Sequence, residues 1–109
     1  MEDILVPIFS PEDRFLLQFA QRLGLQDHVR VSIMDPASSA EKAEGMQQEL
    51  EAISEIDPER IKLLNENVLE KDFLQGKDLM IISLESWKKA VESRSVWLSY
   101  SPSVLIIRS

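Results

Sequence analysis

The sequence predicts a single α/β domain, residues 1–109, in which helices cover both faces of a five-stranded parallel sheet in a three-layer α/β/α arrangement. Five short runs of apolar and β-branched residues are typical of buried strands. Segments with the apolar spacing of amphipathic helices lie between these runs. The regular alternation of strands and helices favours right-handed crossovers, which place the strands parallel.

The predicted strands are the segments where apolar residues run together or alternate, at residues 4–9, 29–34, 60–64, 78–83 and 104–107. The run Leu79-Met80-Ile81-Ile82 is the clearest of the buried strands. Pro7 lies inside the first segment, and proline cannot donate a ladder hydrogen bond. We therefore expect Pro7 at the end of its strand or at a bulge.

The first predicted helix has Ser10 as its N-cap and Pro11 at its first helical position. Asp13 falls in the first turn, where the helix dipole favours a carboxylate, and is expected to be a surface charge. Gly24 is expected to end the helix in the left-handed conformation. The inward stripe of this helix comprises Phe15, Leu16, Phe19, Ala20 and Leu23.

Three further helices are predicted between the later strands, at residues 40–55, 68–74 and 84–91. The first has an outer face of glutamate, glutamine and lysine, which we interpret as solvated. Gly76 ends the second helix. The predicted inward residues are Ala43, Met46, Leu50 and Ile53 in the first, Leu69 and Phe73 in the second, and Trp87, Ala90 and Val91 in the third.

Charge and residue usage exclude several classes of function. Twelve Lys+Arg against nineteen Asp+Glu give a formal charge of -7, which argues against binding to nucleic acid or to an anionic membrane surface. The chain has no cysteine and one histidine, so it offers little for a zinc site or a Ser-His-Asp triad. Its longest apolar runs are about five residues, against the roughly 20 needed for membrane insertion.

The predicted ligand pocket lies where an open parallel sheet usually binds its ligands, beyond the carboxyl ends of the strands. Its candidate residues are Phe9, Ser10, Asp35, Asn65 and Ser83. A phosphate loop needs glycines, and the three glycines of the chain fall inside or at the ends of predicted helices. No nucleophile has an adjacent base. We therefore predict no catalytic residues, no cofactor and no metal site.

Three other features have a functional and a structural interpretation. His28 is compatible with a role as a pH sensor or with a place in a solvated turn. We favour the turn because this is the single histidine of the chain. Trp87 and Trp97 are candidates for stacking on a nucleotide base. The structural alternative is a place in the core for Trp87, and a place in the core or at an interface for Trp97. Ser83 and Ser86 have no partner base and are interpreted as caps and turns.

Two short motifs resemble the universal stress protein family: Ile4-Leu5-Val6-Pro7 in the first strand, and Pro102-Ser103-Val104-Leu105-Ile106-Ile107-Arg108 in the last. The resemblance implies strand order 3-2-1-4-5, the adenine nucleotide alpha hydrolase-like arrangement. Two departures matter. Phe9 stands where nucleotide-binding members have an aspartate, and no glycine occurs between Ser83 and Tyr100. ATP binding is therefore not carried over.

A narrower resemblance connects the sequence to the C-terminal cytosolic domain of monovalent cation:proton (sodium/hydrogen) antiporters. It rests on Ser10-Pro11-Glu12-Asp13-Arg14 before an apolar helix, and on His28-Val29-Arg30-Val31 at the second strand. The chain starts at its first strand and stops at its last, so we expect a domain cut from a longer membrane protein.

This resemblance implies a regulatory domain without catalysis, located in the cytoplasm and linked in cis to a transmembrane antiporter domain. It also implies a homodimer formed through the last strand, by Val104, Leu105, Ile106 and Ile107. The alternative is a free-standing universal stress protein-like domain that binds a small ligand at the strand ends without an ATP phosphate loop.

Overall fold

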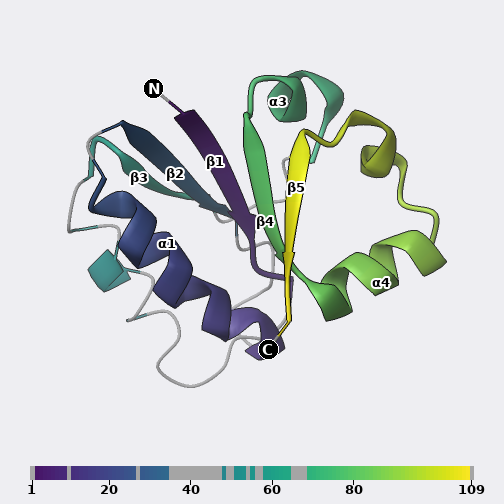
Figure 1. Ribbon diagram of the computed structural model, residues 1–109, viewed down its shortest axis with the longest axis horizontal. Coiled ribbons are helices and arrows are strands. Elements are labelled where there is room, and N and C mark those ends of the chain that lie inside the picture. The colour runs from purple at the N-terminus through teal and green to yellow at the C-terminus, as the bar shows by residue number, and fades with distance from the viewer. Residues whose placement is uncertain are drawn as a thin grey trace.

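The computed structural model describes residues 2–9, 11–26, 28–34, 48, 51–53, 55, 58–64 and 69–108. Five parallel strands form one sheet in the order β3-β2-β1-β4-β5 (Figure 1). The predicted fold class and strand order are confirmed. The strands are β1 (Glu2–Pro7), β2 (Val29–Met34), β3 (Ile61–Leu64), β4 (Leu79–Ser83) and β5 (Ser103–Ile107).

The described helices lie between these strands: η1 (Pro11–Phe15), α1 (Leu16–Gly24), α3 (Lys71–Gln75), α4 (Leu84–Glu92) and η2 (Val96–Tyr100). The first predicted helix therefore begins as a 3₁₀ helix, and η2 is an element that the sequence pattern did not predict. Most of the predicted helix 40–55 lies outside the described residues, although Ile53 is buried in the core. The expected N-cap Ser10 also lies outside them.

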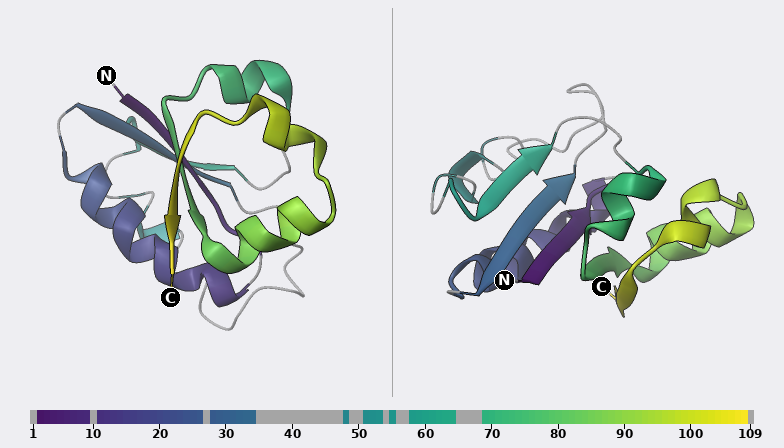
Figure 2. Two further views of the ribbon diagram at one scale, coloured as in Figure 1. Left: turned by 45° about the vertical axis from the view of Figure 1, so that its right-hand side comes forward. Right: turned by 90° about the horizontal axis from the view of Figure 1, so that it is seen from above.

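Alternate residues of β1 point into two separate cores, one on each face of the sheet. Ile4 and Val6 pack with α1, whereas Leu5 packs with residues of α3, α4 and η2. Figure 2 shows these helices on opposite sides of the sheet. Because β1 and β4 are covered on both faces, their sequences are almost continuously apolar, as expected for the interior of a parallel sheet.

Two expectations about single residues have opposite outcomes. Pro7 is the last residue of β1, as predicted, opposite Met34 of β2. Val91 was expected to face inward from α4 but is 51% exposed. The inward side of α4 is formed by Ser86 and Ala90, which are both buried, and by the half-buried Trp87, which packs against the core as predicted. The side of α4 that faces the core therefore includes a serine that its apolar pattern does not predict.

Gly24 has a packing role rather than the predicted left-handed cap. It is the last residue of α1, and the C-cap is Leu25 in a right-handed conformation. A Cβ atom on Gly24 would lie 2.3 Å from Cδ1 and 2.9 Å from Cγ1 of Ile61. Glycine is therefore needed here because α1 passes directly over β3.

Gly24→Ala is expected to lower the free energy of unfolding by about 1–3 kcal/mol, the usual cost of overpacking a core. Adding Ile61→Val removes the Cδ1 atom that the new methyl group meets, so the double variant should lose less stability than the sum of the two single variants. Urea denaturation of the four proteins measures this. Strict additivity would show that the contact with Ile61 is not what requires glycine.

Candidate functional site

A buried carboxylate lies at the carboxyl ends of β1 and β4, where the strand order reverses. Asp13 of η1 is only 1% exposed, so the prediction of a surface charge is wrong. Its Oδ1 accepts a hydrogen bond from the Ser83 hydroxyl at 2.5 Å. Its Oδ2 accepts one from the Ser86 hydroxyl at 2.6 Å and one from the backbone N–H of Phe9 at 3.0 Å. Distances this short are typical of hydroxyls that donate to a charged carboxylate.

The two serines also build the start of α4. Ser83 is the last residue of β4 and the N-cap of α4, and its Oγ accepts a hydrogen bond from the backbone N–H of Ser86 at 3.1 Å. The predicted capping role of Ser83 is confirmed. The first turn of α4 is the positive end of its helix dipole, which favours the carboxylate of Asp13 beside it. Asp13 therefore connects the β1–η1 loop to the β4–α4 junction.

Two of the five predicted pocket residues meet around this carboxylate. Phe9 donates to it through its backbone, and Ser83 through its hydroxyl. The other three, Ser10, Asp35 and Asn65, lie outside the described residues. Phe9 follows β1, which ends two residues earlier than predicted.

A cleft of about 220 Å³ opens beside Ser86, between α4 and η2. One side of it is aromatic. The ring of Phe9 stacks on Trp97 with centroids 6.3 Å apart and planes at 18°, and Trp87 meets Trp97 edge to face at 6.2 Å. The lining residues are Phe9, Ser86, Lys89, Ala90, Ser93, Ser95 and Trp97.

The turn after α4 shapes one end of the cleft. Arg94 has a φ of 54°, in the left-handed region that usually requires glycine. The N–H of Ser95 bonds the carbonyl of Ala90 at 3.0 Å, and the N–H of Arg94 bonds that of Val91 at 3.1 Å. These two bonds form a Schellman motif. As a result the hydroxyls of Ser93 and Ser95 lie 3.0 Å apart.

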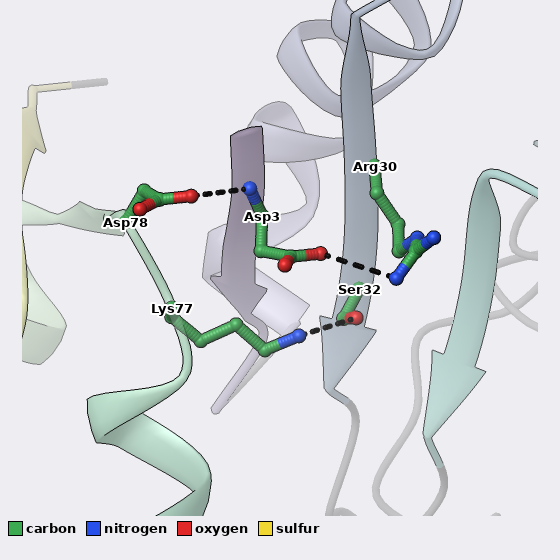
Figure 3. Close-up of polar contacts among 5 residues, drawn as sticks. All are labelled: Asp3, Arg30, Ser32, Lys77 and Asp78. Atoms are coloured by element: carbon green, nitrogen blue, oxygen red, sulfur yellow. Dashed lines mark hydrogen bonds and ion pairs between the residues drawn. The ribbon is translucent and has the colours of Figure 1, made fainter. Parts of the chain in front are cut away.

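A second polar cluster connects β1, β2 and the segment that precedes β4 (Figure 3). The ammonium of Lys77 donates to the Ser32 hydroxyl at 3.2 Å. The N–H of Asp3 donates to Oδ2 of Asp78 at 2.8 Å, and the Asp3 carboxylate lies 3.8 Å from the Arg30 guanidinium. Asp3 is the second residue of β1 and Asp78 directly precedes β4, whereas Asp13 follows the carboxyl end of β1, so the two clusters involve different residues of the sheet.

Stability should depend on pH through Lys77. Its pKa is lowered from the ordinary value of 10.5, chiefly because burial disfavours the charged form; Asp3 opposes the shift, and Arg30 and Lys62 add to it. The unfolded chain therefore holds the proton to higher pH than the native chain. The contribution of Lys77 to unfolding free energy should rise as pH approaches 10.5 from below.

Lys77→Met should remove this rise. Urea denaturation across the alkaline range, with Lys88→Met at an exposed position of α4 as the control, measures the difference. Equal alkaline slopes in the wild-type chain and both variants would contradict the prediction.

Two absences hold for the described part of the chain. Its His, Asp and Glu residues form no group of three or more that is able to hold a metal ion. Among the described helices, none has the length and apolar character needed to cross a membrane.

Comparison of the chain with protein-family models, curated proteins and solved structures finds no match. The class of the domain therefore follows from its geometry. It is a parallel α/β domain with strand order 3-2-1-4-5, a buried carboxylate–hydroxyl cluster where the strand order reverses, and an aromatic cleft beside that cluster.

Most residues of this site could not be identified from the sequence. Asp13 and Glu12 occupy the same predicted turn, and no pattern marked Asp13 as the buried one. Ser86 was predicted only as a cap or turn residue. No sequence pattern indicates that Lys89, Ser93 and Ser95 belong to a site. Their place at the cleft depends on η2 and on the left-handed conformation of Arg94.

Proposed function

We propose that this domain is a regulatory and dimerisation domain without catalysis of its own, and that it forms the cytosolic part of a cation:proton antiporter. The observation that carries the proposal is the exposed outer edge of the sheet. β5 pairs with β4 on one side only in the described sheet. Leu105 is 48% exposed and Ile106 is 40% exposed.

The chemistry of β5 suits a second copy of the same chain. An edge strand offers N–H and C=O groups along its free side, and charged residues usually protect such an edge. Residues Ser103–Ile107 carry no charge. Two identical strands are able to pair antiparallel about a two-fold axis, which makes the interface self-complementary. Pairing through β5 also covers part of the apolar surface of Leu105 and Ile106.

The link to an antiporter is supported by the resemblance of Pro11-Glu12-Asp13-Arg14 to the cytosolic domains of that family. In this fold Asp13 holds η1 to the start of α4, which gives a physical reason for an acidic residue at that place in the motif. A dimer that rearranges is able to favour one state of an attached transporter, with a coupling of roughly 1–3 kcal/mol.

Fractionation of the source cell tests this assignment. An antibody to the domain should detect a band far heavier than 12.5 kDa, confined to membranes. Deletion of the domain from that protein should then change cation-driven proton flux. A soluble band near 12.5 kDa would contradict the antiporter assignment.

A free-standing small-ligand-binding protein is the second candidate, because the aromatic cleft beside Ser86 offers a defined place for a ligand. The same fractionation separates the two, since this candidate predicts the light soluble band.

A further inference from the structure

The cleft between α4 and η2 has a hydrogen-bonding character that follows from its hydroxyl groups. Each serine has one hydroxyl proton. Ser86 gives its proton to Oδ2 of Asp13 at 2.6 Å. Ser93 gives its proton to the carbonyl of Ala90 at 3.3 Å. The 3.0 Å contact between Ser93 and Ser95 fits either direction, and we assign Ser95 as its donor because the Ser93 proton is directed to Ala90.

With this assignment all three hydroxyl protons are directed to groups of the protein. Where these oxygens meet a ligand, they therefore act as hydrogen-bond acceptors. A ligand that meets these oxygens must carry N–H or O–H groups. The buried Asp13 fixes the orientation of Ser86, and the Schellman turn at Arg94 fixes the Ser93–Ser95 pair.

Two other properties narrow the ligand further. Lys89 lines the cleft from the exposed side of α4 and brings a positive charge. Phe9 and Trp97 supply an aromatic side. Their ring centroids are 6.3 Å apart, whereas a ring inserted between them needs about 7 Å, two contacts of about 3.5 Å. A ligand ring therefore lies against the pair rather than between its members.

The volume indicates how large a group the cleft encloses. A cleft of about 220 Å³ encloses a group of one or two rings, and the rest of a larger ligand would extend into solvent.

We propose that this cleft binds a small aromatic carboxylate that carries an amino or hydroxyl group. The carboxylate pairs with Lys89, the N–H or O–H groups donate to the oxygens of Ser86 and Ser95, and the ring packs on Phe9 and Trp97. The inference does not rest on the β5 dimer or on the antiporter assignment. It concerns a different surface, and its test is independent of the oligomeric state.

The test uses three related probes, 4-aminobenzoate, benzoate and aniline, with calorimetric titration and the NMR signal of the Trp97 indole N–H as readouts. 4-Aminobenzoate should bind and shift the Trp97 signal. Benzoate lacks the donor and aniline lacks the charge, so each should bind about tenfold more weakly or worse. The same result is expected for the Ile106→Lys variant, which separates this inference from the dimer proposal.

Two variants of exposed lysines on α4 test whether Lys89 supplies the charge that pairs with the carboxylate. Lys89→Met should weaken the binding of 4-aminobenzoate about tenfold and leave the binding of aniline unchanged. Lys88→Met removes the same charge from a residue that does not line the cleft, and should have no effect. The proposal is overturned if 4-aminobenzoate fails to bind at millimolar concentration, if benzoate or aniline binds as tightly as 4-aminobenzoate, or if the Lys89→Met and Lys88→Met variants bind 4-aminobenzoate equally.

Discussion

Asp13→Ala is expected to lower the free energy of unfolding by about 3 kcal/mol or more. The substitution leaves two buried hydroxyls, Ser83 and Ser86, and the N–H of Phe9 without their acceptor. Each buried polar group that loses its partner costs about 1–3 kcal/mol. Because the three donors come from both sides of the point where strand order reverses, the loss should affect cooperative unfolding of the whole domain. Urea denaturation followed by circular dichroism measures it.

Two control variants make this result specific. Asp13→Asn keeps the size of the side chain and one oxygen, so it should lower the free energy of unfolding by an intermediate amount. Glu12→Ala removes the neighbouring carboxylate of η1, which is exposed, and should change stability by less than about 0.5 kcal/mol. Equal effects of Glu12→Ala and Asp13→Ala would mean that the buried cluster does not hold these elements together.

A double-mutant cycle between Asp13→Ala and Ser86→Ala measures the interaction between these two side chains. We expect the double variant to lose clearly less stability than the sum of the losses in the single variants, since both substitutions remove the same hydrogen bond. An additive result would place the stabilising effect of Asp13 elsewhere.

The strands could be predicted because their signals are local. β2 has the predicted bounds 29–34, and β4 starts within one residue of its predicted start. The start of the first helix was less predictable, because a proline followed by acidic residues is compatible with both a 3₁₀ and an α-helical turn. The role of Gly24 was also not predictable from local sequence. The sequence indicates a glycine at a helix end, but only the packing of α1 on Ile61 explains why glycine is found there.

The candidate site was mostly unpredictable because its contacts are long-range. Asp13 and Ser83 are 70 residues apart in sequence, and only the position of β4 next to β1 brings them together. The cleft depends on Arg94 in the left-handed region, where sequence patterns favour glycine. By contrast, the predicted position of the last strand and its apolar residues could be read directly from residues 104–107.

Ile106→Lys is expected to convert the proposed dimer into a monomer. A two-fold interface receives the substitution twice, so two ammonium groups must be accommodated at one apolar edge. Lysine on an edge strand is also a common natural barrier to edge pairing. The variant should fold, because Ile106 is 40% exposed. Leu25→Lys is the matched control. Leu25 is 68% exposed and follows α1, away from β5, so its substitution should not change self-association.

Sedimentation equilibrium of the wild-type chain and these two variants tests dimerisation through β5. The wild type and Leu25→Lys should give a species of twice the 12.5 kDa chain mass, and Ile106→Lys should give a 12.5 kDa species. A wild-type chain that stays at 12.5 kDa at all concentrations, or an Ile106→Lys variant that stays dimeric, would contradict dimerisation through β5.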